Sequence, residues 1–112
     1  MAHRGIKQIF DELWDLLQSK DSDYAGKESL SNFRVCERFG VPGWKGAAIR
    51  MSDKWSRFMS LMEKSGPSVK DESLDDTLKD LIVYAAIVLV LRKEIENQER
   101  NRVPNSQNRA GS

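Results

Sequence analysis

Apolar residues recur at helical spacing along most of this chain, and no segment shows the alternation of a β-strand. The first segment predicts an amphipathic helix over residues 5–19. Its apolar positions lie one, three or four residues apart: Ile6, Ile9, Phe10, Leu13, Leu16 and Leu17. A loop rich in small and acidic residues follows, and a shorter helix is expected over residues 29–38.

Two further helices are predicted in the second half of the chain. Glycines and a proline mark residues 39–46 as a turn, and a helix is expected over residues 47–64. Its predicted buried stripe is Met51, Trp55, Phe58 and Met62. The longest helix is predicted over residues 69–98, after which no periodic apolar residue occurs. Residues 1–98 therefore predict one all-α domain with three long helices and one short one, and residues 99–112 a disordered tail.

The longest predicted helix has two distinct faces. One stripe should face the domain's own core: Leu74, Leu78, Leu81, Ala85 and Val88. A row of acids lies on roughly the opposite side: Glu72, Asp76 and Asp80. This row continues into a second apolar surface: Val83, Ile87 and Val90. A helix that is apolar all round is buried all round, so this surface predicts a contact with another subunit and hence a homo-oligomer.

The acid row has two interpretations. Acids in a first helical turn are stabilised by the helix dipole, and Glu72 fits this solvated role as well as any other. Asp80 lies three turns in, beside apolar residues, where a carboxylate needs a cation. Carboxylates on successive turns suit Mg²⁺, which water and phosphate oxygens would complete. Ion pairing of Asp76 and Asp80 with a basic helix is the competing interpretation.

A row of basic residues is available for that pairing. Arg50, Lys54 and Arg57 share one face of the helix over residues 47–64. Asp53 precedes Arg57 by one turn, which is compatible with an ordinary surface ion pair. The alternative is a cationic row that binds phosphate oxygens opposite the acids. The two rows together predict a water-excluding crevice between the two helices.

The overall composition excludes several classes of function. The 112 residues carry a formal charge of +1, so no general attraction to DNA or to a membrane is expected. A single cysteine, Cys36, excludes an internal disulfide, and with His3 as the one histidine the chain lacks the residues for a zinc site or a Ser-His-Asp triad. The apolar run over residues 81–91 is too short for a membrane helix, and the charged amino terminus is not a signal peptide. A cytoplasmic protein is expected.

Aromatic residues divide into core and loop groups. Trp55 and Phe58 are expected in the core, because they lie on a helical stripe. Tyr24 and Trp44 lie in segments predicted as loops, where an exposed aromatic ring can stack on a base.

Four segments together resemble a known family: "DSDYAG", "LSNF", "GWKGAAIRMSDKWSR" and "VKDESLDDTLKDLIVYA". They are similar to small phage and prophage proteins of the nucleotide modification associated domain family, first type. The resemblance covers residues 20–86 and adds Asn32, beside Phe33, to the nucleotide-binding candidates. More distantly, the chain resembles the all-α MazG-like NTP pyrophosphohydrolases, which hold Mg²⁺ with acidic pairs on two helices. Here Asp53 alone stands where the first pair would be.

The resemblance implies a nucleotide-handling protein in the host cytoplasm, and two functions follow. The first is a Mg²⁺-dependent (deoxy)nucleoside triphosphate pyrophosphohydrolase, with Asp76 and Asp80 on the metal and Lys54 and Arg57 on the phosphates. The alternative is a non-catalytic oligomeric sponge that sequesters a nucleotide signal of host defence. A third interpretation is a structural protein whose charged rows only pair with each other.

Overall fold

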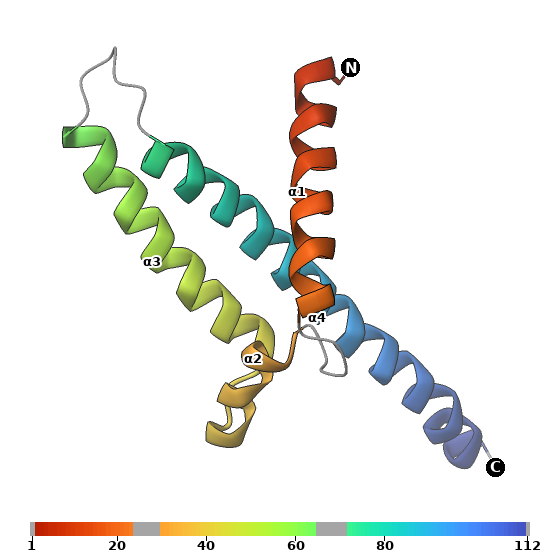
Figure 1. The fold of residues 1–112 in the computed structure, drawn as a ribbon. Helices are drawn as coiled ribbons and strands as arrows, with labels where there is room; N and C mark the ends of the chain where they lie inside the picture. Colours follow the sequence, from red (N-terminus) through yellow and green to blue (C-terminus); the bar gives the residue numbers. More distant parts are fainter. Residues whose placement is uncertain (1, 24–29, 65–71, 112) are drawn as a thin grey trace.

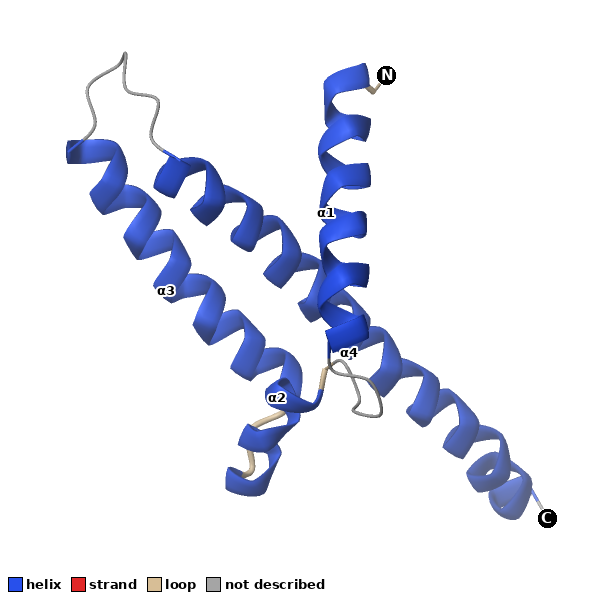
Figure 2. Ribbon diagram, viewed as in Figure 1, coloured by secondary structure: helices blue, strands red, loops and turns tan. Residues whose placement is uncertain are grey.

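The fold is described from a computed structural model that covers residues 2–23, 30–64 and 72–111, with side chains for residues 2–20, 30–64 and 73–101. The elements in chain order are α1 (Arg4–Asp23), α2 (Ser31–Arg34), the 3₁₀ helix η1 (Val35–Phe39), α3 (Gly43–Lys64) and α4 (Glu72–Gly111). Every element in these ranges is helical (Figure 2). The predicted all-α architecture of three long helices and a short helical segment is therefore confirmed.

The helices α3 and α4 form an antiparallel hairpin, which is the main packing contact of the molecule (Figure 1). The short α2 and η1 segments pack at the start of α3, and α1 crosses α4 on the side away from α3 (Figure 1). The buried apolar side chains in the described part of the chain are few: Leu13, Ala47, Leu81 and Leu91. Thr77 is also buried, and its hydroxyl donates to the carbonyl oxygen of Ser73 at 2.7 Å.

The start of α3 lies earlier than the sequence predicted. Residues 43–46 were expected in a turn, but α3 begins at Gly43. Pro42 permits this start because its carbonyl oxygen accepts hydrogen bonds from the N–H groups of Lys45 and Gly46, at 3.0 and 3.2 Å. Gly40 has a left-handed backbone, with φ of 78°, and ends η1. Of these glycines, Gly40 therefore makes the turn, whereas Gly43 and Gly46 belong to the helix.

The absence of side chains at Gly43 and Gly46 lets α2 and η1 approach α3 closely. A Cβ atom at Gly46 would lie 2.6 Å from the Sγ of Cys36, and one at Gly43 would lie 3.0 Å from the carbonyl oxygen of Phe33. Cys36 is a half-buried thiol whose Sγ lies 3.3 Å from that same carbonyl oxygen. This close approach fixes Phe33 at the junction of the helices.

The buried face of α3 differs from the predicted stripe. Trp55 and Met62 are exposed, whereas Met51 and Phe58 are half-buried as part of a face that also contains Ala47, Lys54 and Leu61. The sequence pattern missed this face because a lysine interrupts it. In α4, Leu81 is buried as predicted, but Leu78 is exposed.

The second apolar surface of α4 is covered differently from the prediction. Val83 and Ile87 were expected to contact another subunit, but they line a pocket with Leu13, Leu16 and Leu17 of α1. Val90 is exposed. The first helix of the same chain therefore occupies part of the surface assigned to a partner.

The ends of the outer helices also differ from the predictions. Helix α1 runs to Asp23 rather than ending near residue 19, so Lys20 is helical. Helix α4 begins at Glu72 and continues to Gly111, past the predicted end at residue 98. The prediction stopped at the last apolar turn, but Gln98, Glu99 and Arg100 are good helix formers. The disorder expected of residues 99–112 stays a prediction.

Candidate functional site

The two predicted charged rows meet at one ion pair. The Nζ of Lys54 lies 3.0 Å from a carboxylate oxygen of Asp80, so α3 and α4 are joined by opposite charges at this level. The side chains are 34% and 47% exposed, and such a partly solvated pair contributes only about 0–1 kcal/mol to stability. This ion pair is the alternative that the sequence left open for Asp80. Because both side chains are partly exposed, bulk water reaches the pair, and the predicted exclusion of bulk water is wrong.

The register of the hairpin places the remaining charged residues on the same side. Arg57 follows Lys54 by three residues, and Asp76 precedes Asp80 by four. Because α3 and α4 are antiparallel, both residues lie about one turn from the ion pair in the same direction. Both are exposed. We call this side of the hairpin the charged flank, formed by Arg50, Lys54 and Arg57 of α3 and by Asp76 and Asp80 of α4.

Aromatic rings adjoin the charged flank. The guanidinium carbon of Arg50 lies 5.1 Å from the centroid of the Phe33 ring, within range of a cation–π interaction. The Phe33 ring in turn meets the Tyr84 ring edge-on, with centroids 5.8 Å apart and an interplanar angle of 82°. Residues of α2, α3 and α4 are thus linked in one aromatic and cationic cluster.

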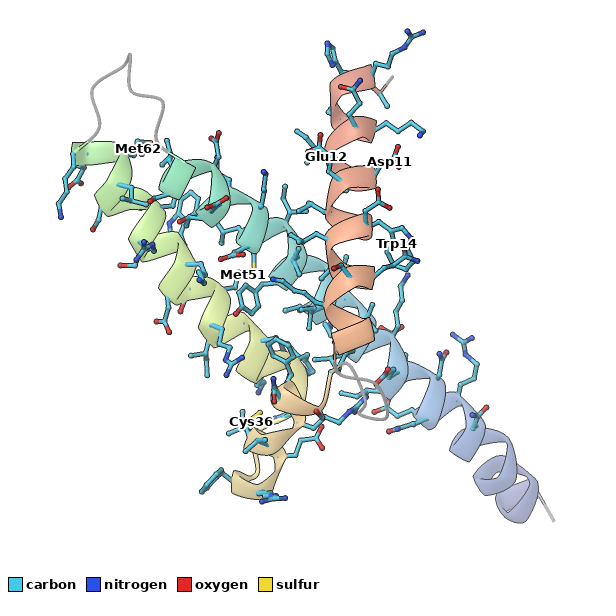
Figure 3. All side chains as sticks on the ribbon, in the orientation of Figure 1. Asp11, Glu12, Trp14, Cys36, Met51 and Met62 are labelled. Atoms are coloured by element: carbon cyan, nitrogen blue, oxygen red, sulfur yellow. The ribbon has the colours of Figure 1, made fainter. Side chains whose placement is uncertain are left out.

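A pocket opens beside this cluster, between α1, α2 and α4. It has a volume of about 330 Å³, within the usual range for small-molecule sites. We call it the junction pocket. Its lining residues are Leu13, Leu16, Leu17, Lys20, Phe33, Lys79, Asp80, Val83, Tyr84 and Ile87. In Figure 3 the side chains of α1 and α4 converge at this crossing.

The electrostatics of the junction pocket favour an anionic ligand with an apolar part. Lys20 and Lys79 supply positive charge from two different helices. Asp80 is the one carboxylate among the lining residues, and Lys54 already neutralises it. The walls are aliphatic and aromatic, so a planar ring can be buried there while phosphate oxygens meet the lysines.

The described residues do not assemble the predicted magnesium site. Among described side chains, no three acidic, histidine or cysteine residues come together as a metal-binding group. Asp53 and Asp76 are exposed, and Asp80 is paired with Lys54. Glu72 is the first residue of α4, but its side chain lies outside the described residues. Mg²⁺ therefore stays a prediction, and the visible donor set does not fit it.

Trp44 lies apart from the junction pocket. Its ring centroid lies 5.6 Å from the Nζ of Lys45 and 5.5 Å from the guanidinium carbon of Arg92. It borders a separate cavity of about 110 Å³, beside an ion pair in which Arg34 and Glu94 approach to 2.6 Å. This cavity is smaller than ordinary ligand sites.

The two remaining nucleotide-binding candidates are Asn32, which lies in α2, and Tyr24. Asn32 is exposed and lines a pocket with Cys36 and Ile49, whereas Tyr24 lies outside the described residues.

Sequence reasoning missed four important residues of the pocket: Lys20, Phe33, Lys79 and Tyr84. Lys20 was assigned to a loop, and Lys79 adjoins the acid row without belonging to either charged row. A signal was present, because Lys79 and Val83 are one turn apart on the face that α1 covers. Their convergence depends on where α1 crosses α4, which no local pattern specifies.

No protein-family model, curated protein or solved structure matches this chain. The resemblance noted in the sequence therefore stays a prediction, and the geometry of the junction pocket has to support any functional proposal. Within the described ranges, no helix combines the length and apolar character needed to cross a bilayer.

Proposed function

We propose that this chain binds a nucleotide or nucleotide-derived anion in the junction pocket, through lysines rather than through a metal ion. The observation that carries the proposal is the convergence of Lys20 and Lys79 on an aromatic and aliphatic pocket whose one lining carboxylate, Asp80, is held by Lys54. The ligand's ring would lie near Phe33 and Tyr84, and its phosphates would face the lysines. The resemblance to nucleotide-handling phage proteins supports the same ligand class.

Capture without turnover is the role that this arrangement favours. Hydrolysis of a triphosphate by two metals requires several carboxylates around the phosphates. In the described part of the site, Asp80 is the carboxylate best placed for that role, and it forms an ion pair with Lys54. We therefore propose a sponge that withholds a nucleotide signal of host defence. The Mg²⁺-dependent pyrophosphohydrolase is the second candidate, and the specific feature in its favour is the spacing of Asp76 and Asp80 along α4.

The two functions predict opposite effects of one substitution. Asp80→Asn removes a negative charge from the pocket and keeps the shape of the side chain. If lysines bind the phosphates, this variant binds the ligand as tightly as the wild type or more tightly. If Asp80 holds Mg²⁺, the variant loses metal-dependent binding and turnover.

The experiment is isothermal titration with a panel of ribonucleotides, deoxyribonucleotides and cyclic dinucleotides, each in EDTA and in Mg²⁺, followed by chromatography of the recovered ligand. We expect binding in EDTA and an intact ligand. Lys79→Ala should weaken binding about tenfold or more, since it removes a charged hydrogen-bond donor. Lys93→Ala, an exposed lysine farther along α4, is the matched control and should have no effect. Absence of binding to the entire panel, or cleavage of the ligand, would contradict the proposal.

A further inference from the structure

The side of the hairpin opposite the charged flank is apolar and uncovered. Consecutive residues of a helix point about 100° apart, so Trp55 and Lys54 lie on different sides of α3. Met59 and Met62 follow Trp55 at four and seven residues and share its side. All three are exposed, and Trp55 has 52% of its surface in solvent.

Helix α4 continues this apolar surface. Leu78, Ile82 and Leu89 are separated by four and seven residues, which places them on one stripe, and that stripe lies roughly opposite Asp80. Leu78 and Leu89 are exposed. We call the combined surface the apolar flank: Trp55, Met59 and Met62 of α3 with Leu78, Ile82 and Leu89 of α4. None of these positions carries a charge.

The apolar flank also contains a groove. Leu78 and Ile82 line a cavity of about 520 Å³ together with Leu81 of α4 and Ile9 of α1, and the charged Asp75 and Lys79 of α4 complete the lining. Because Lys54 pairs with Asp80, the neighbouring Trp55 lies at the level of α4 between Leu78 and Ile82. A large exposed ring and an open apolar groove therefore stand at the same height on the two helices of one hairpin.

The exposed area is too large for a compact monomer. The chain exposes 9236 Å², whereas a compact monomer of this length exposes about 6,300 Å². Its radius of gyration is 18.6 Å, against about 13 Å for a compact domain of this length. The difference, about 2,900 Å² summed over the whole chain, exceeds the roughly 800 Å² that each partner contributes to a standard interface, so the exposed surface is sufficient for one such contact.

We propose that a second copy of this chain covers the apolar flank, in a two-fold dimer whose axis runs along the hairpin. This axis places α3 of one protomer over α4 of the other, at equal height. Trp55 of each protomer then enters the groove between Leu78 and Ile82 of its partner. Two hairpins joined in this way close a four-helix bundle.

A second copy fits this surface because the ring and the groove of the flank are complementary about the proposed axis. A two-fold contact pairs residue i of one protomer with residue j of the other, and j with i. Because Trp55 and the groove stand at one height, both copies of the ring meet a groove at once. The two charged residues that line the groove, Asp75 and Lys79, have opposite signs, whereas a membrane-binding helix face carries an excess of lysines and arginines.

The test compares two exposed tryptophans by light scattering coupled to gel filtration. We expect a dimer mass for the wild type and a monomer mass for Trp55→Glu, with a dissociation constant raised more than about thirtyfold. Trp14→Glu is the matched control: Trp14 is 61% exposed and projects from the side of α1 that faces away from α3 (Figure 3), so this variant should remain dimeric.

Further variants distinguish a loss of dimerisation from a failure of the Trp55→Glu chain to fold. Ile82→Glu changes the other side of the contact and should also give a monomer with unchanged helical circular dichroism. In a Cys36→Ala background, Trp55→Cys with Ile82→Cys should form disulfide-linked dimers on oxidation, whereas either cysteine alone should not. A monomeric wild type, a trimeric or larger mass, a dimeric Trp55→Glu variant or a monomeric Trp14→Glu variant would each overturn the proposal.

The proposal does not depend on nucleotide binding, because none of the six residues of the apolar flank lines the junction pocket, and only Lys79 lines both that pocket and the groove. Trp55→Glu should therefore bind nucleotides with the affinity of the wild type. Loss of dimerisation with retained binding, or the reverse, separates the two proposals.

Discussion

The two flanks of the α3–α4 hairpin are built from the same two helices and have opposite chemistry. On the charged flank, Lys54 and Asp80 join the helices through an ion pair at 3.0 Å beside a pocket of lysines and aromatic rings. On the apolar flank, Trp55 and Leu78 are exposed and carry no charge. A rotation of about 100° along the helix separates Lys54 from Trp55, and with it two different kinds of binding surface.

This contrast underlies the two proposals. The Lys54–Asp80 pair of the charged flank is partly hydrated, and the junction pocket beside it is the proposed site of an anionic ligand. The apolar flank is the proposed contact with a second copy, since exposed apolar area is stabilised when another apolar surface excludes water. The buried residues between the two helices, such as Ala47 of α3 and Leu91 of α4, fix the position of α3 against α4 and so of both flanks.

The largest effect is expected from a substitution that removes the common core of both flanks. Leu91→Ala deletes a side chain that is only 3% exposed and should lower the free energy of unfolding by about 2–5 kcal/mol. Urea unfolding followed by circular dichroism measures this loss. Leu16→Ala, at an exposed position of α1, is the control and should cost less than about 1 kcal/mol. Equal losses for the two variants would show that the hairpin core does not hold the flanks.

A smaller effect is expected at the contact that positions Phe33 beside the charged flank. Gly46→Ala would place a Cβ atom 2.6 Å from the Sγ of Cys36, so unfolding free energy should fall by about 1–2 kcal/mol, partly offset by better helix propensity. In a Cys36→Ala background the same substitution should stabilise the chain, because only the gain in propensity remains. Thermal unfolding of the wild type, the two single variants and the double variant gives the coupling free energy between the two substitutions. Ligand affinity should fall in Gly46→Ala while the dimer mass is retained.

The smallest effect is expected for the ion pair itself. A double-mutant cycle with Lys54→Met and Asp80→Asn should give a coupling energy of no more than about 1 kcal/mol in urea unfolding at low salt. The coupling should decrease further in 1 M NaCl, because salt screens partly exposed charges. A coupling of several kcal/mol that resists salt would indicate a dry, buried pair, and the charged flank would then be a structural contact.

Much of the fold was predictable from local patterns. The helical period of apolar residues predicted α1, α3 and α4, and the glycine and proline cluster predicted the break before α3. The same period located Leu81 in the core. It failed at α3, where the residues that face α4 include Lys54, because a lysine with a carboxylate partner can occupy a position that the pattern assigns to apolar residues.

The candidate site was predictable only in part. Lys54 and Asp80 were identified from their spacing on two helices, and the structure brings them together. Lys20, Phe33, Lys79 and Tyr84 were not identified, because they come from three elements whose convergence depends on the crossing of α1 over α4. Trp44 was expected in a loop near the site, but it belongs to the first turn of α3 and borders a different cavity.

The sequence by itself determined that this chain is helical and that two of its helices carry matched charges, since both properties follow from the spacing of residues along a helix. Only the tertiary structure decided which side of each helix meets the other, because a hairpin can in principle form at several rotations. That rotation places Lys54 against Asp80, leaves Trp55 and Leu78 exposed, and so puts the charged flank and the apolar flank on opposite sides of the hairpin.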